Sequence, residues 1–355
     1  MTMLAEVVDA VIGTGTHRDS HEVEIADLAG RPIATMRIGN DSKGFAQLLA
    51  AIAEVVPGPR VLVLVEGTRG YGIGLARALA AAGLRVIECE QPRRKQRRGK
   101  GKSGPIDAHL AVLAALRLEA NRVAVPRADG DREALRILLV ARQEITVACK
   151  AQASRLRALL LAGDDTDRRA ARTTLSKTAL AALAGRELPA GASREQAVRH
   201  AETARLALAI GQARGQLNGS HAQLLAVVDD IAPGLTSRYG IGPVSAAQAI
   251  VTFSHPGRCR REAAFAALGG TSPLPASSGS TIRHRPNRGG DRALNRAIHA
   301  IALTRMRNCP RTRAYAARRT AEGKTTREIR RCLKRYIARE LYRQLTRSMK
   351  PLTNP

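Results

Sequence analysis

Hydrophobic and polar positions in the first third of the chain follow two periods, one typical of strands and one typical of helices. Three short strand-like runs, separated by turn residues such as Gly30 and Pro32, predict a three-stranded meander. A fully apolar run at residues 61–65 predicts a buried strand, residues 85–88 predict another strand, and the segments around them have helical spacing. The predicted strands are residues 11–16, 21–27, 33–38, 61–65 and 85–88, and the predicted helices are residues 45–56, 75–82 and 106–118. The pattern indicates an α/β domain.

Two long helices are predicted in the middle of the chain, at residues 131–161 and 193–228. Both segments are rich in Ala, Leu, Arg and Gln, with apolar side chains at every third or fourth position. Gly163 ends the first segment, and a turn at residues 189–191 precedes the second. We expect an antiparallel, coiled-coil arm that acts as a spacer or in dimerisation.

The last third of the chain is predicted to be mainly α-helical, with a Gly-, Ser- and Pro-rich stretch at residues 269–290. Residues 305–335 contain twelve basic residues against Glu322 and Glu328. Such a segment forms either a helical face that binds phosphates or a solvated charged face. These patterns divide the chain into domains at residues 1–126, 127–232 and 233–355.

Charge and composition narrow the class of partner. The chain has 58 Lys and Arg against 30 Asp and Glu, a formal charge of +28, which favours a polyanion such as DNA or RNA. With 44% hydrophobic residues it should fold and not remain a disordered basic tail. Three Phe, five Tyr and no Trp leave few rings for base stacking, so we expect contacts mainly to phosphate.

Other features predict a cytoplasmic protein without membrane segments. No apolar run reaches the roughly 18 residues of a membrane helix, and the N-terminus lacks the basic and apolar regions of a signal peptide. The five cysteines are widely spaced without a C-x-x-C pair, which fits neither a disulfide framework nor a zinc module.

Two segments have the residue types that contact nucleic-acid backbones. A predicted loop at residues 93–102 is strongly basic and has no apolar anchor. Residues 240–247, in which Gly240 and Gly242 lead into an apolar helix, are typical of a helix-hairpin-helix turn, whose N–H groups point at a phosphate. An ordinary glycine turn between packed helices is the alternative. The basic side chains of the loop are Arg93, Arg94, Lys95, Arg97, Arg98, Lys100 and Lys102.

Two carboxylates are candidates for metal binding. Glu66 ends a buried apolar strand, where a carboxylate is costly unless it is paired or bound to a metal. Asp107 lies near the start of a predicted helix. At one edge of the sheet the two could bind Mg²⁺ for phosphodiester chemistry. Alternatively, Glu66 pairs with an arginine and Asp107 stabilises the helix N-terminus.

A serine pair in the last third precedes a basic run. Ser277 and Ser278 are followed by Arg283, Arg285 and Arg288. Cations around a serine stabilise the charge of a phosphorane and favour the alkoxide, so this hydroxyl could attack a phosphodiester. Taken alone, the residues fit a linker more commonly than a nucleophile.

Together, these motifs resemble the DEDD transposases of the insertion sequence 110 family, whose members include RNA-guided recombinases. Residues 13–21, 65–68 and 102–108 follow the family's acidic motifs in order. The C-terminal half adds the hairpin and further motifs, so the resemblance covers almost the whole chain. These C-terminal motifs are residues 240–247, 265–270, 278–279 and 287–290.

The resemblance implies an N-terminal RuvC-like, ribonuclease-H-like domain with four metal-binding acids, a coiled-coil insert, and a C-terminal domain with a nucleophilic serine. By this resemblance Glu66 and Asp107 match two of the acids, and Ser278 matches the serine. Gly15 and Gly104 stand where the family has aspartate.

The two glycines bear on the expected metal site. Without two anionic ligands, Mg²⁺ affinity should fall sharply, and aspartates at Gly15 and Gly104 should restore it. Asp19 lies four residues beyond Gly15, roughly 13 Å along a strand, and reaches the site only if the strand turns first.

The sequence therefore predicts a transposase-type recombinase that binds the DNA of its element ends and target, together with a guide RNA, as a dimer or tetramer. Strands would be exchanged through Ser278, assisted by Mg²⁺ at the RuvC-like site. The alternative is a decayed or repurposed nucleic-acid-binding protein of the same fold. Gly15 and Gly104 separate the two hypotheses.

Overall fold

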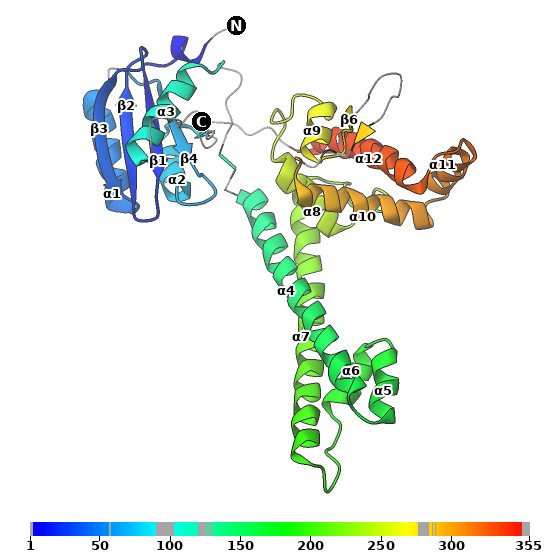
Figure 1. Cartoon of the computed structure of the whole chain (residues 1–355). Coiled ribbons are helices and arrows are strands. Elements are labelled where there is room, and N and C mark those ends of the chain that lie inside the picture. Colours follow the sequence, from blue (N-terminus) through cyan, green and yellow to red (C-terminus); the bar gives the residue numbers. More distant parts are fainter. Residues whose placement is uncertain are drawn as a thin grey trace. The chain divides into compact units, whose positions relative to one another are not determined.

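The computed structural model describes residues 3–56, 58–89, 103–119, 126–127, 130–275, 284–285, 287 and 289–349. They form two compact units (Figure 1). The first contains the chain up to Glu133 together with Ser254–Arg258, and the second contains Ala134–Phe253 and Cys259–Met349. The division into three domains made from the sequence stays a prediction.

The first unit is a five-stranded sheet with helices on both faces (Figure 1). The strand order is β3-β2-β1-β4-β5, in which β1, β2 and β3 are antiparallel while β4 and β5 run parallel to β1. This mixed sheet is consistent with the expected RuvC-like domain, and the predicted meander is confirmed. The elements are β1 (Ala10–Thr16), β2 (Ser20–Ala26), β3 (Pro32–Gly39), β4 (Val61–Glu66), β5 (Arg85–Cys89), α1 (Ser42–Val55), α2 (Ile73–Ala81), α3 (Gly104–Leu116) and a 3-10 helix (Leu4–Glu6).

The central strand β4 explains why this sheet needs helices on both faces. Every residue of β4 is buried. Because side chains alternate along a strand, Val63 and Val65 pack beneath α1 and α2, whereas Leu62 and Leu64 pack beneath α3. A continuous apolar run in the sequence therefore predicts a central, doubly covered strand.

His21 on β2 couples the stability of this unit to pH. Its ring is fully buried, stacks on Phe45 with centroids 6.2 Å apart, and has Nε2 3.0 Å from Asn40 Oδ1. Burial lowers the pKa of His21 below its ordinary value of 6.5, although the hydrogen bond to Asn40 Oδ1 acts in the opposite direction. The unfolded chain therefore binds a proton at this histidine more readily than the folded chain does. The free energy of unfolding is not reduced by this effect above pH 6.5, and it falls as the pH drops below 6.5.

Denaturant unfolding between pH 5 and 7.5 tests this expectation. The contribution of His21 has a limiting slope of about 1.4 kcal/mol per pH unit, and the His21→Gln variant should lose it. An identical pH dependence in the two proteins would assign the slope to other groups.

The second unit combines a helical arm with a compact helical core (Figure 1). The two long helices predicted from the sequence are confirmed as α4 and α7, which run side by side in opposite directions. The elements of the arm are α4 (Gly130–Leu161), α5 (Asp165–Arg172), α6 (Lys177–Ala184) and α7 (Arg194–Ile231). Those of the core are α8 (Pro243–Phe253), α9 (Glu262–Leu268), β6 (Leu274–Pro275), β7 (His284–Arg285), α10 (Arg292–Asn308), α11 (Pro310–Ala321) and α12 (Thr326–Ser348).

Each end of the arm has its own hydrophobic cluster. At the tip, Leu156 and Leu160 of α4 pack with Leu206 and Ile210 of α7 and with the short helix α6. The capping box of Ser193 and Gln196 starts α7 just beyond this cluster. The tip helices α5 and α6 were not predicted from the sequence.

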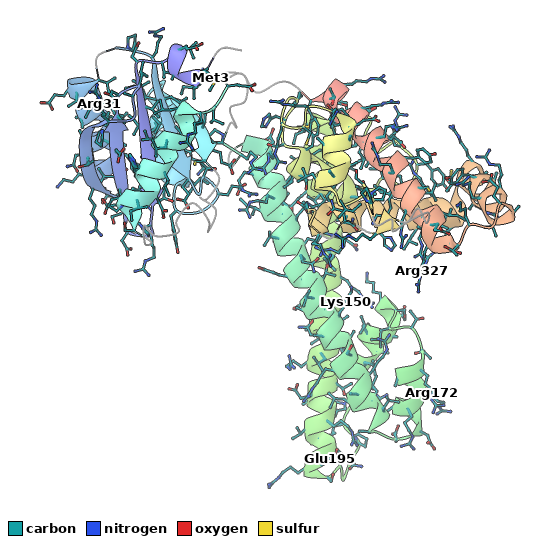
Figure 2. All side chains as sticks on the ribbon, turned by 45° about the horizontal axis from the view of Figure 1, so that its top comes forward. Met3, Arg31, Lys150, Arg172, Glu195 and Arg327 are labelled. Carbon is teal, nitrogen blue, oxygen red and sulfur yellow. The ribbon has the colours of Figure 1, made fainter. Side chains whose placement is uncertain are left out.

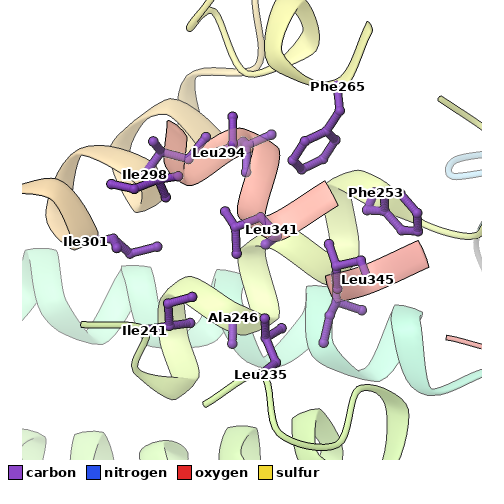
Figure 3. Packing of buried hydrophobic residues seen from close by; sticks show 14 of the residues in the cluster. Leu235, Ile241, Ala246, Phe253, Phe265, Leu294, Ile298, Ile301, Leu341 and Leu345 are labelled. Carbon is purple, nitrogen blue, oxygen red and sulfur yellow. The ribbon is translucent and has the colours of Figure 1, made fainter. Parts of the chain in front are cut away.

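The core of the second unit is built around α8, α9, α10 and α12 (Figure 3). Phe253 and Phe265 are fully buried, with ring centroids 5.8 Å apart in an edge-to-face contact. Leu224 and Val228 at the end of α7 join the same cluster, so the arm is continuous with this core. Among the described residues, no helix combines the length and the apolar character that a membrane crossing requires.

Candidate functional site

Two glycines on β1 allow helix α3 to lie directly on the strand backbone. Gly13 and Gly15 alternate with buried side chains that face the other side of the sheet. A Cβ atom on Gly13 would overlap the carbonyl oxygen of Ala108, and one on Gly15 would overlap that of Gly104. Because Gly104 and Ala108 are one helical turn apart, α3 meets the strand at two successive points. A side chain at Gly15 would therefore displace the helix.

The two predicted acids lie at the same end of the sheet as this contact. Glu66 is the last residue of β4 and is 7% exposed, and Asp107, in the first turn of α3, is 8% exposed. Thr14 of β1 pairs with Val65, and the hydroxyl of Thr16 donates to the carbonyl oxygen of Glu66 at 3.0 Å. The structure thus places both acids near the Gly15–Gly104 contact. Their roles as catalytic or metal-binding residues stay a prediction.

The residues around this contact do not fit a four-carboxylate metal site. By the family resemblance Gly15 and Gly104 stand at the two remaining acidic positions. Packing leaves no room for a side chain at either, since a Cβ on Gly15 would overlap the carbonyl oxygen of Gly104 and a Cβ on Gly104 would lie 2.5 Å from Glu22 Cγ. Among the described residues, no group of three or more His, Cys, Asp or Glu side chains could hold a metal ion. Asp19 is exposed and accepts hydrogen bonds from Arg18 at 3.0 Å. We therefore derive no step through Mg²⁺.

Two carboxylates on β2 face α3, and the sequence analysis missed them. Glu24 is buried, and its Oε1 lies 2.7 Å from Nδ1 of His109 in α3. Glu22 lies beside Gly104 and 3.6 Å from Arg37. The alternation of charged residues with Val23 and Ile25 was the available signal, but it does not reveal that a helix covers the charged face. The Glu24–His109 pair instead helps to fix α3 on the sheet.

The second unit contains a strongly basic cavity of about 590 Å³ between α10, α12, residues 270–273 and β7. Seven cationic side chains line it, and none of its described lining residues is acidic. Five of the seven lie on one face of α12, at helical spacing. Arg327, at the start of that helix, is labelled in Figure 2. The cations are Arg285, Arg292, Arg327, Arg330, Arg331, Lys334 and Arg335.

Positive charge and burial act together inside this cavity. The Nζ atom of Lys334 donates to Oδ1 of Asn295 at 2.6 Å, and burial lowers the pKa of this lysine below its ordinary value of 10.5. The pKa of His299 is lowered by burial and then by Lys334 and Arg330, which favours its neutral form. Such a site attracts an anion, because no described carboxylate in its wall competes for the cations.

Comparison with known proteins identifies the family. Residues 232–317 match the family model described as "Transposase IS116/IS110/IS902 family", and residues 12–162 match the IS110-type DEDD model described as "Transposase". The chain belongs to the IS110 family of transposases. DEDD transposases typically use a divalent metal, whereas no group of three or more His, Cys, Asp or Glu side chains that could hold one gathers among the described residues.

One curated relative of this IS110-family transposase comes from an insertion element. It is the "Insertion element IS110 uncharacterized 43.6 kDa protein" of Streptomyces coelicolor, which is 35% identical over 124 residues. The matched segment spans 34% of this chain and 30% of the relative. The two family models thus identify a transposase of the IS110 family, and the name of this relative places it in an insertion element.

The predicted serine of this transposase lies outside the described residues, but its flanks do not. Strands β6 and β7 pair through Leu274 with Arg285 and through Pro275 with His284. Pro273 and Arg285 line the basic cavity. Residues on both sides of the Ser278 segment, Pro273 and Arg285, thus belong to the cavity wall. Also outside the described residues lie Arg93, Arg94, Lys95, Arg97, Arg98, Lys100, Lys102, Arg283 and Arg288.

The predicted hairpin of the transposase lies between α7 and α8. Gly240 has φ +75°, and a Cβ there would lie 3.2 Å from the Arg305 side chain, so the turn requires glycine. The carbonyl oxygen of Gly242 accepts the N–H of Ala246 at 2.9 Å at the start of α8. The turn between two helices is confirmed, whereas helix-hairpin-helix binding of phosphate by Gly240 and Gly242 stays a prediction.

Proposed function

We propose that this IS110-family transposase binds DNA in its C-terminal cavity and exchanges DNA strands through Ser278. The observation that carries the proposal is the cavity itself, with seven cations, no described acid, and residues on both sides of the Ser278 segment in its wall. Guanidinium and ammonium groups stabilise the charge that develops on a phosphorane and favour the serine alkoxide.

In the proposed step, the Ser278 oxygen forms a bond to phosphorus as the bond to the departing sugar oxygen breaks. The serine proton passes to a base, and the departing oxygen takes up a proton. His299 is the base we assign, because it lines the cavity and its lowered pKa favours the neutral imidazole. Attack by a second strand on the serine ester reverses the step, so the number of phosphodiester bonds is conserved.

The remaining parts of the proposal concern partners. The formal charge of +28 supports binding to the element ends and the target DNA, and to a guide RNA. Exposed apolar side chains along the arm, among them Val140, Val147 and Leu208, support a homo-oligomer on DNA. The basic residues at positions 93–102 and Arg283, Arg285 and Arg288 would add phosphate contacts.

A second candidate function is a nucleic-acid-binding protein that has lost strand exchange. The observation that favours it is the close packing of Gly15 against Gly104, the two positions at which the family resemblance expects aspartates. The two functions differ in whether a covalent intermediate forms.

A nicked DNA substrate that traps the covalent intermediate tests the proposed function. The Ser278→Ala variant should form no protein–DNA adduct on a denaturing gel, yet bind DNA as the unmodified protein does, because the hydroxyl acts on phosphorus and not on the positioning contacts. Ser277→Ala is the matched control and should retain the adduct. Equal adduct from Ser278→Ala would exclude this nucleophile, and DNA binding without any adduct from the unmodified protein would favour the second candidate.

A further inference from the structure

The basic cavity has an aromatic edge. Tyr336 of α12 lines the cavity and is 52% exposed. Tyr315 of α11 meets it edge to face, with ring centroids 6.0 Å apart and planes at 84°. Two of the five tyrosines of the chain therefore gather beside the seven cations.

Neighbouring side chains hold this aromatic pair in place. The guanidinium of Arg318 lies over the ring of Tyr315, 5.6 Å from its centroid. Burial raises the pKa of Tyr315 above its ordinary value of 10, and Cys332 and Tyr336 add to the effect. Tyr315 thus packs against Tyr336 and supports its ring, while about half of Tyr336 is exposed and accessible to a ligand.

A ligand for both features needs closely spaced negative charges and a flat apolar face. Nucleic acid has both, but the bases of a duplex are stacked on one another and cannot also stack on a side chain. Unpaired nucleotides can place phosphates against basic residues and a base against an aromatic ring at the same time. The overall composition, with few aromatic residues, does not reveal that two tyrosines lie together at this cavity.

We propose that the cavity binds an unpaired segment of nucleic acid, with phosphates at the cations of α12 and one base stacked on Tyr336. The inference rests on the proposed assignment of the cavity to nucleic acid, but it is independent of Ser278. DNA and RNA share the required chemistry, and the experiment separates them.

Fluorescence polarisation with the full chain at one salt concentration tests the inference. The labelled probes are an oligothymidylate, an oligouridylate and a mixed-sequence DNA duplex of the same length. Tyr336→Ala should weaken single-strand binding by about 5- to 100-fold, as expected for the loss of one stacked base, and change duplex binding less than about twofold. The single strand that the unmodified protein binds more tightly identifies the DNA or RNA source.

Two matched variants define the outcome. Tyr336→Phe keeps the ring and should retain single-strand affinity. Tyr239→Ala removes a tyrosine of similar exposure, 49%, that does not line the cavity, and it should also retain single-strand affinity. Thermal melting of each variant checks the fold. Unchanged single-strand affinity in Tyr336→Ala, or an equal loss for duplex and single strands, would overturn the inference.

The result is separable from the proposed function. Ser278→Ala should leave the single-strand affinity and its dependence on Tyr336 unchanged. An absent adduct with intact Tyr336-dependent binding contradicts strand exchange alone, whereas a normal adduct without any Tyr336 effect contradicts the stacking site alone.

Discussion

Raising the salt concentration from about 50 to 200 mM should weaken nucleic-acid binding by about 10³- to 10⁵-fold if six to ten phosphates are contacted. Each phosphate neutralised by a Lys or Arg releases condensed counterions, and added salt opposes that release. The cavity supplies seven cations without a described acid, and the whole chain has a formal charge of +28. Electrophoretic mobility shift assays at several salt concentrations measure the slope of affinity against salt concentration.

A single charge removal localises the effect. Arg331→Gln in the cavity should reduce the salt slope by about one phosphate contact. Arg343→Gln is the matched control on the same helix, because that guanidinium lies 3.5 Å from Glu262 and does not line the cavity. A salt-independent affinity would contradict phosphate binding, and equal slopes for the two variants would place the contacts elsewhere.

Replacing Gly15 with alanine should lower the free energy of unfolding of the first unit by about 1–3 kcal/mol or more. The new Cβ would overlap the carbonyl oxygen of Gly104. Because the neighbouring atoms belong to the backbone and not to a flexible side chain, only a shift of the helix or the strand would relieve the overlap. Urea denaturation followed by circular dichroism measures the loss. Gly70→Ala is the control in the same unit, since its Cβ would meet its nearest atom, the carbonyl oxygen of Gly67, at an ordinary 3.6 Å.

The same contact changes the expectation for restored acids. From the sequence, aspartates at Gly15 and Gly104 should recover a Mg²⁺-dependent stability. In the structure both side chains overlap their neighbours, so the double variant should be destabilised with or without Mg²⁺. A rise in melting temperature with Mg²⁺ would show that α3 can move away from β1 and that the acids do assemble.

Local periodicity was enough to predict the sheet and the arm. Alternating positions and short apolar runs located β1 to β5, and a three-to-four spacing located α4 and α7. The glycine contact could not be predicted, because a glycine on a strand signals close approach without saying what approaches. That Gly15 meets Gly104 depends on how α3 crosses β1.

The basic segment at residues 305–335 shows the same limit. Its composition predicted a phosphate-binding face, yet only tertiary packing decides which cations converge. Arg305 pairs with Glu340 at 2.7 Å instead, while Arg330 and Lys334 turn into the cavity. The Tyr315–Tyr336 contact joins two helices and leaves no periodic signal.

Because α4 and α7 run in opposite directions, the length of the arm can change without a change in the core to which both helices are joined. The chain leaves the core along α4 and returns along α7, so both ends of the arm are anchored at one place. At 1.5 Å per residue, deleting seven residues from each helix would shorten the arm by about 10 Å and preserve the facing side chains. Insertions or deletions matched in this way alter reach without disturbing the sheet or the cavity. A variant with a matched deletion in α4 and α7 should therefore keep the hydrophobic clusters at both ends of the arm while its tip lies closer to the core.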